Sequence, residues 1–194
     1  MKTQQAGKLE VICGSMFSGK SEELIRRLRR AEFARLTLQV FKHQLDDRTT
    51  TDHVHAHSGA TISAVAAHSV QELRHKINPT TQVIGIDEVQ FFEPSIVQLI
   101  LELIDNKHRV IVAGLDLDFR MLPFGCMPAL MAIADEIVKL KAVCVVCGDE
   151  ARFTQRLVDG KPAQAADPLI MIGAQNCYQA RCRSCYQLTS AWHE

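Results

Sequence analysis

Residues 14–21 read Gly14-Ser15-Met16-Phe17-Ser18-Gly19-Lys20-Ser21 and fit G-x-x-x-x-G-K-[ST], the pattern of a phosphate-binding loop, or P-loop. The apolar residues 9–13 before this stretch predict a short buried strand, and residues 22–30 after it predict a helix. The pattern therefore lies between the strand and the helix that a P-loop requires. The alternative is a glycine turn that matches by chance, which these flanks disfavour.

The chemistry of such a loop follows from its backbone. Glycines let several backbone N–H groups point toward one anion, and the following helix adds the partial positive charge of its N-terminus. Lys20 is expected to reach the β- and γ-phosphates of a nucleotide, and the Ser21 hydroxyl is expected to ligate Mg²⁺. The stretch thus predicts a nucleotide site that uses magnesium.

A second motif ends another predicted strand. Residues 82–88 read Gln82-Val83-Ile84-Gly85-Ile86-Asp87-Glu88, an apolar run that ends in acid as a Walker B strand does. Asp87 is expected to hold Mg²⁺, usually through water. Because side chains alternate along a strand, Glu88 is expected on the other side of the strand end, facing the reacting atoms. The alternative is a strand that merely ends in two acids.

The rest of the first 140 residues predicts an α/β fold. Further strands are expected at residues 37–41, 108–114 and 136–140, the last as a core strand. Helices are expected from a capping box at residues 69–72 to about residue 77, from Pro94 at its first position to about residue 106, and after Pro128. We therefore expect a P-loop parallel sheet flanked by helices as a domain of residues 1–140.

Polar residues follow two of these strands. Asp46 and Arg48 come after the second strand, where loops border the ligand crevice of a parallel sheet, although they could be ordinary loop charges. Asp116 and Asp118 follow the strand at residues 108–114 and could form an acid/base pair. Capping or hydration is the interpretation that we favour for these two aspartates.

Three histidines alternate at His53, His55 and His57, which would place them on one face of an extended segment. Three imidazoles could bind a transition metal. Such a site normally collects ligands from several segments, and nothing in the sequence points to a second segment. We therefore favour a polar strand face.

The last 54 residues, 141–194, contain two pairs of closely spaced cysteines. They form two C-x-x-C pairs separated by residues 148–181, which is 34 residues, and each pair fits one half of a tetrahedral zinc site. A closed set of four thiolates indicates a structural metal, in a small zinc-binding domain of residues 141–194; a redox dithiol is the alternative. The four expected ligands are Cys144, Cys147, Cys182 and Cys185. The other three, which we expect to be buried or incidental thiols, are Cys13, Cys126 and Cys177.

The amino-acid composition limits the kinds of partner that we expect the protein to bind. Apolar residues make up 47% of the 194-residue chain, which is enough for a core, and 22 basic residues balance 22 acidic ones. A net charge of zero gives no general attraction to nucleic acid or to an anionic membrane. No apolar run approaches the ~20 residues of a membrane span, and residues 1–7 lack an apolar signal core, so we expect a cytoplasmic protein with reduced thiols.

Over about residues 8–188 the chain resembles the type II thymidine kinases, the cytosolic and bacterial kind with a zinc-held lasso. The P-loop and the cysteine pairs occur in many families, whereas the D-E-x-Q-F-F block between them is much more specific. The resemblance rests on these elements in this order: residues 14–21, then Asp87-Glu88-Val89-Gln90-Phe91-Phe92, then Leu115-Asp116-Leu117-Asp118-Phe119, then both cysteine pairs.

The resemblance implies ATP-dependent phosphorylation of the 5′-hydroxyl of thymidine, with Glu88 as the general base. It also implies a structural Zn²⁺, a homotetramer and inhibition by thymidine triphosphate. The nucleotide-binding residues that it implies are Gly14, Ser15, Met16, Phe17, Ser18, Gly19, Lys20, Ser21, Asp87, Glu88, Val89 and Gln90, with Asp46 and Arg48 near the phosphates.

The resemblance also implies a nucleoside pocket. Residues 170–178 are similar to the lasso segment whose backbone holds thymine, and they depart from the family pattern at Ala174 and Cys177. The pocket residues that the resemblance implies are Met16, Phe91, Leu115, Phe119, Thr154, Met171, Ile172, Gly173, Ala174 and Tyr178.

Two other classes compete with a nucleoside kinase. A P-loop ATPase could use a zinc ribbon to bind nucleic acid, but residues 141–194 hold six basic and five acidic residues, a net charge of only +1. A GTPase switch would need an N-K-x-D motif, and Asn106-Lys107-His108-Arg109 lacks its aspartate.

Overall fold

The computed structural model describes residues 6–44, 53–56, 59–170 and 177–188. A six-stranded sheet forms the centre of the molecule, in the spatial order β5-β2-β6-β7-β1-β8, and every neighbouring pair in it is parallel. The strands are β1 (Lys8–Gly14), β2 (Leu38–His43), β5 (Val65–Ala67), β6 (Val83–Asp87), β7 (Arg109–Gly114) and β8 (Glu136–Leu140). The predicted parallel sheet is confirmed.

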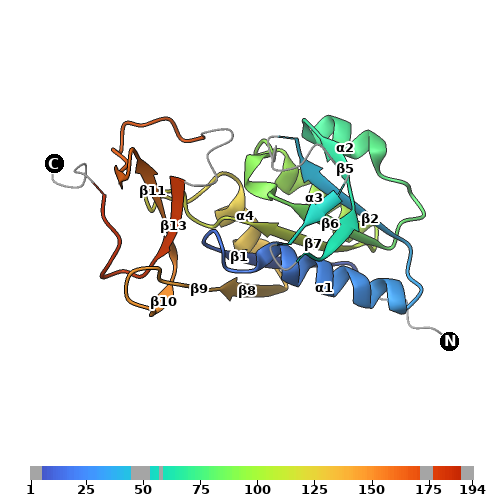
Figure 1. The fold of residues 1–194 in the computed structure, drawn as a ribbon. Helices are drawn as coiled ribbons and strands as arrows, with labels where there is room; N and C mark the ends of the chain where they lie inside the picture. The colour runs from blue at the N-terminus through green and yellow to red at the C-terminus, as the bar shows by residue number, and fades with distance from the viewer. Residues whose placement is uncertain (1–5, 45–52, 57–58, 171–176, 189–194) are drawn as a thin grey trace.

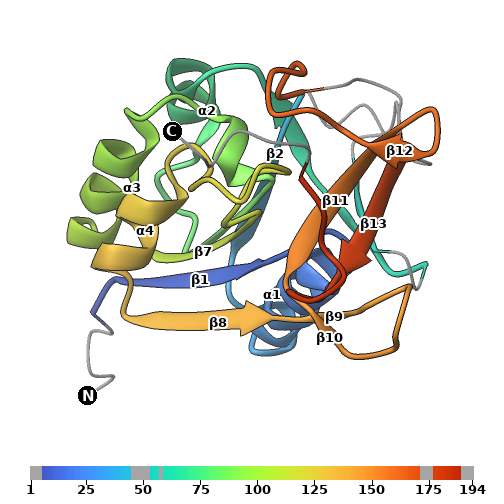
Figure 2. The same ribbon diagram turned by 90° about the vertical axis from the view of Figure 1, so that its left-hand side faces the viewer.

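Helices cover both faces of this sheet. Helix α1 (Lys20–Phe33) lies on one face, and α2 (Val70–Lys76), α3 (Ile96–Asp105) and α4 (Met127–Ile133) lie on the other (Figures 1 and 2). Strand β1 shows how the alternation of side chains builds the two layers. Val11 and Cys13 pack among α3 and α4, whereas Ile12, between them in sequence, packs against Leu24 and Leu28 of α1.

Local sequence explains where the helices form. In α1 the side chains of Leu24, Ile25, Leu28 and Ala31 make one buried stripe, which is the expected spacing for a helix on a sheet. Helix α2 begins after Ser69, whose hydroxyl accepts a hydrogen bond from the backbone N–H of Glu72, as the predicted capping box requires.

A second, smaller part follows β8 and lies beyond the carboxyl ends of the central strands (Figure 1). It contains a two-stranded antiparallel sheet and a three-stranded one, in which β11 pairs with both β12 and β13. Its strands are β9 (Ala142–Val143), β10 (Glu150–Ala151), β11 (Phe153–Val158), β12 (Lys161–Pro162) and β13 (Tyr178–Arg181).

Two expectations about the elements were wrong in detail. Residues 136–140 form an edge strand that is largely exposed and, among the described strands, pairs with β1 alone, because no later strand of the described residues joins this sheet. Pro94 does not occupy the first position of its helix: Pro94 and Ser95 form a turn, and α3 begins at Ile96.

The histidine segment is an ordinary hairpin. His53 and His55 lie on β3 (His53–His55), which pairs with β4 (Thr61–Ser63), and their ring centres are 6.0 Å apart. His57 lies outside the described residues. The only group of three or more potential metal-binding side chains in the described ranges consists of four cysteines, so the polar strand face that we favoured fits the structure.

None of the helices in the described part of the chain combines the length and the apolarity that crossing a membrane requires.

Candidate active site and metal centre

The P-loop leaves the sheet at the carboxyl end of β1. Gly14 has φ +143°, and a Cβ atom there would lie 2.4 Å from the carbonyl oxygen of Leu140 on β8. Only glycine therefore allows the loop to turn so close to the neighbouring strand. The Ser18 hydroxyl closes the turn by donating to the Ser15 carbonyl at 2.8 Å.

Lys20 is the first residue of α1, and its side chain is 8% exposed. Its Nζ atom donates to the Ser15 carbonyl at 2.8 Å, so the ammonium group bends back over the loop that precedes it. This position places a buried positive charge beside the loop backbone and the helix N-terminus. Such an arrangement fits an anionic ligand.

The two predicted magnesium residues meet, although 66 positions separate them in sequence. Ser21 Oγ donates to Asp87 Oδ2 at 2.9 Å, and Asp87 Oδ1 accepts from the backbone N–H of Glu88 at 3.0 Å. Strand β7 lies between β1 and β6, so the P-loop and Asp87 flank the end of β7. A hydroxyl and a carboxylate are hard oxygen donors, which are the ligands that Mg²⁺ prefers.

Glu88 follows the strand in a left-handed conformation, with φ +50° and ψ +41°. Strand β6 ends at Asp87, so the alternation of side chains that we used to orient Glu88 does not apply to it. A non-glycine residue in this region costs on the order of 1 kcal/mol or more, and strained residues of this kind cluster at active sites; Glu88 is one of six in the described ranges. Glu88 is 6% exposed, so its carboxylate lies within the protein and not on the surface.

The residues expected in the nucleoside pocket that lie in the described ranges come from several elements of the fold. The backbone N–H of Met16 donates to the Thr154 hydroxyl at 3.0 Å, which joins the P-loop to β11. The Arg156 guanidinium lies 5.0 Å from the ring centre of Phe119, and Arg156 is the register partner of Tyr178 across β11 and β13. Two further members, Phe91 and Leu115, lie at the ends of β6 and β7, within η1 (Val89–Phe91) and directly after Gly114.

The aspartates after β7 are engaged in structural contacts. Asp116 forms an ion pair with Lys139 at 2.5 Å. Asp118 accepts from the backbone N–H groups of Arg120 and Leu122 at 2.7 and 3.0 Å and also pairs with the Arg120 guanidinium. These contacts agree with the capping interpretation and not with an acid/base pair.

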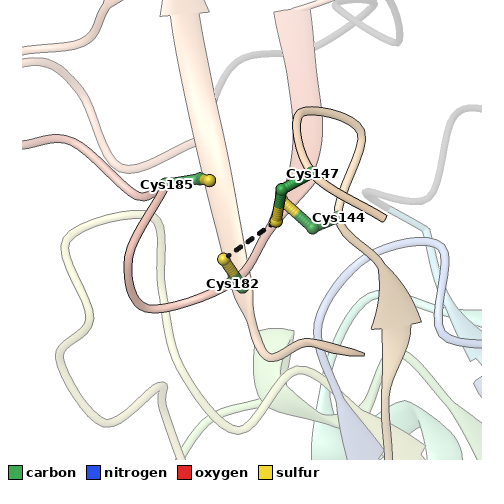
Figure 3. A group of neighbouring side chains, drawn as sticks. All are labelled: Cys144, Cys147, Cys182 and Cys185. Atoms are coloured by element: carbon green, nitrogen blue, oxygen red, sulfur yellow. Dashed lines mark hydrogen bonds between the residues drawn. The ribbon is translucent and has the colours of Figure 1, made fainter. Parts of the chain in front are cut away.

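The four cysteines of the two C-x-x-C pairs converge at the junction of β9, β10 and β13 (Figure 3). Their sulfur atoms all lie within 4.8 Å of one another, and Sγ of Cys147 is 3.6 Å from Sγ of Cys182. A disulfide would need about 2.05 Å, whereas thiolates bound at about 2.3 Å to one tetrahedral zinc lie roughly 3.8 Å apart. The arrangement therefore fits a structural zinc ion.

The surroundings of Cys144 favour the thiolate that a metal needs. Burial raises the pKa of the Cys144 thiol, but hydrogen bonds from the backbone N–H groups of Cys182, Val146 and Cys147 outweigh burial and lower it to about 6. Outside the cluster, burial raises the pKa of both Cys13 and Cys126 to about 11, as expected for inert thiols.

Several expected residues lie outside the described ranges. They are Asp46 and Arg48 near the phosphates, and Met171, Ile172, Gly173 and Ala174 of the lasso segment.

The structure also identifies contacts that our sequence reasoning missed. Arg156 is 1% exposed and stacks on Phe119, and its position two residues after Thr154 on the same strand could have indicated it. Tyr186, directly after the zinc-site residue Cys185, donates its hydroxyl hydrogen bond to the carbonyl of Phe119. No sequence pattern pointed to this contact, which links the segment of the cysteine cluster to Phe119, a residue expected in the nucleoside pocket.

A comparison with protein-family models adds independent support for the sequence resemblance. The model described as thymidine kinase matches residues 7–186, which includes the P-loop, the Asp87-Glu88 strand end and all four zinc-site cysteines. With this match over most of its length, the chain belongs to the thymidine kinase family, of the type II kind.

Proposed function

We propose that the chain transfers the γ-phosphoryl group of Mg·ATP to the 5′-hydroxyl of thymidine, with Glu88 as the general base. Membership of the thymidine kinase family supports the phosphorylation of thymidine in general. The observation that carries the finer proposal is the meeting of Ser21 with Asp87 at 2.9 Å, directly beside the buried Glu88. One corner of the sheet would thus supply the groups that bind phosphate, bind the metal and accept the proton.

Each group has a physical role in this reaction. Phosphoryl transfer depends mainly on positioning and on neutralising phosphate charge, which the P-loop N–H groups and Lys20 provide. Ser21 and Asp87 would hold Mg²⁺, which supplies charge stabilisation at the phosphates. A nucleoside hydroxyl is a poor nucleophile, so Glu88 would accept its proton as the bond to phosphorus forms.

The zinc centre would have a structural role. Four cysteines would complete the coordination of a zinc ion and leave no position for substrate. The contact of Tyr186 with the carbonyl of Phe119 supports a role in holding the pocket wall. A homotetramer, inhibition by thymidine triphosphate and a cytoplasmic location stay predictions of the resemblance and the composition.

The test is a panel of nucleosides incubated with Mg·ATP, with each product identified as a 5′-monophosphate. We expect thymidine to react best and deoxyuridine to react more weakly, because a methyl pocket is worth about 1–3 kcal/mol. ATP hydrolysis stimulated by DNA, with no nucleoside phosphorylated, would contradict the proposal and support a nucleic-acid ATPase instead.

A further inference from the structure

Gln90 lies beside Glu88 and contacts it directly. Its side chain is buried, with 3% of the residue exposed, and Nε2 donates to Glu88 Oε2 at 2.6 Å. At the other end of the same amide, Oε1 accepts from the backbone N–H of Leu115 at 3.1 Å. One side chain therefore joins the carboxylate after β6 to the backbone after β7.

The direction of this amide is determined by its partners. A backbone N–H can only donate, so the oxygen of the Gln90 amide must face Leu115 and its NH₂ group must face Glu88. An amide NH₂ group cannot accept a proton. The amide therefore holds Oε2 of Glu88 as a hydrogen-bond acceptor, and Oε1 would take the proton in the proposed reaction.

Gly114 provides the space for the amide. A Cβ atom at position 114 would lie 2.5 Å from Gln90 Oε1, 2.9 Å from Met127 Sδ and 3.1 Å from Val89 Cγ1. The glycine at the end of β7 therefore lets the amide reach Leu115. A methyl group there would displace the end of the Gln90 side chain.

We propose that Gln90 is a positioning residue that holds Glu88 Oε2 so that Oε1 faces the acceptor hydroxyl. This inference rests on the proposed role of Glu88 as the base. Glu88 follows the end of β6 in a left-handed conformation, so the strand does not by itself fix the direction of its side chain.

The test compares three variants with a matched control. Gln90→Leu removes both hydrogen bonds. Gln90→Glu keeps the shape but places a second carboxyl group beside Glu88, which replaces the amide donor and perturbs the pKa of the pair. Gly114→Ala displaces the amide through the added Cβ atom. Gln98→Leu is the control, because exposed Gln98 on α3 also hydrogen-bonds a carboxylate, that of Glu102.

We expect kcat to fall about 10- to 100-fold in both Gln90 variants and less in Gly114→Ala, since the lost bond is to a charged group. The dissociation constants of thymidine and Mg·ATP, measured by calorimetry, should stay within about threefold, and Gln98→Leu should be unchanged. Unchanged kcat in both Gln90 variants would overturn the inference.

A double-mutant cycle separates positioning from a merely structural role. If Gln90 acts through Glu88, Gln90→Leu should have little further effect on kcat in the Glu88→Gln background. If the reductions in kcat of the two single variants multiply in the double variant, and Tm and the binding of both substrates also fall, Gln90 has a structural role and the inference is overturned. Near-normal kcat in Glu88→Gln alone would instead overturn the proposed base, so the two failures are distinguishable.

Discussion

The backbone N–H of Met16, in the phosphate loop, donates to the hydroxyl of Thr154, in the second sheet, at 3.0 Å and across 138 positions of sequence. This bond connects the nucleotide site to the part of the chain that carries the four cysteines. The two parts therefore meet at the phosphate loop.

Removing this bond should affect both substrates. In Thr154→Val the Met16 N–H loses its acceptor, and a lost neutral hydrogen bond of about 1 kcal/mol should lower kcat/KM roughly fivefold for thymidine and for Mg·ATP. Thr154→Ser retains the hydroxyl and should behave like the original protein. Steady-state kinetics check this prediction, and equal activity of the valine and serine variants would contradict it.

Glu88→Gln should reduce turnover while substrates still bind. The variant keeps the size of the side chain but cannot accept a proton, and general-base catalysis contributes about 10²–10⁴-fold. We expect kcat to fall by that factor with little change in the dissociation constants of thymidine and Mg·ATP. Glu22→Gln, on the exposed face of α1, is the control. Turnover near the original value would contradict the role of Glu88 as the general base.

Asp87→Asn should change the magnesium dependence. The amide is a weaker ligand for Mg²⁺ than the carboxylate, so we expect a higher Mg²⁺ concentration at half-maximal activity. Lys20→Ala should instead weaken Mg·ATP binding or transfer at every Mg²⁺ concentration, because it removes a charge from the phosphate site. Magnesium titrations at saturating ATP measure both effects, and an unchanged midpoint for Asp87→Asn would show that the metal interpretation is wrong.

Loss of the metal should damage thymidine binding before ATP binding. In the described residues, the buried cluster around the cysteines otherwise contains only the small side chains of Ala142, Ala151 and Ala180, so we expect this part to depend on a bound metal. We expect Cys182→Ala, or zinc removal, to weaken thymidine binding strongly through the contact of Tyr186 with Phe119, and Mg·ATP binding less, through Met16.

Calorimetric titrations with thymidine and with Mg·ATP, on protein whose zinc content has been measured, test whether thymidine binding is lost first. Ser184→Ala changes an exposed residue between two cysteines and should keep both affinities. Equal loss of both affinities would mean that zinc supports the whole fold, and unchanged thymidine affinity would exclude a role in the pocket.

The buried carboxylate of Glu10, near the end of β1 that lies away from the P-loop, should make the free energy of unfolding depend on pH. Glu10 is 1% exposed and pairs with Arg109, Arg27 and Lys8 at 2.6 to 2.7 Å. Burial raises the pKa of Glu10, but hydrogen bonds from Arg109, Lys8 and Arg27 outweigh it and lower the pKa from 4.5 to about 2. Because the folded pKa is the lower one, this stabilisation is complete above pH 4.5 and is lost as the pH falls toward 2.

Glu10→Gln should therefore lower the free energy of unfolding by about 3 kcal/mol at pH 7 and flatten its dependence between pH 4.5 and 2. Urea unfolding at a series of pH values measures both effects. Glu32→Gln changes an exposed glutamate of α1 and should leave the curve nearly unchanged. An unaltered acid slope in Glu10→Gln would contradict the prediction.

Local patterns in the sequence were sufficient to predict the P-loop, the strand that ends at Asp87, the parallel sheet and the two cysteine pairs. Each depends on neighbouring residues: spacing determines which side chains share a face, and glycine determines where the backbone can turn. The edge position of β8 was missed, because a strand's place in a sheet depends on which other strands pair with it.

Only the tertiary structure decided how Glu88 is held and how the two parts meet. The left-handed conformation of Glu88 was not indicated by any pattern in the sequence. The amide of Gln90, which contacts Leu115, and the bond from Met16 to Thr154 join segments that no local pattern connects. Hydrogen bonds of this kind depend on positions fixed by packing of the whole chain. Local sequence therefore determined which groups the site contains, and the packed fold determined which of them touch.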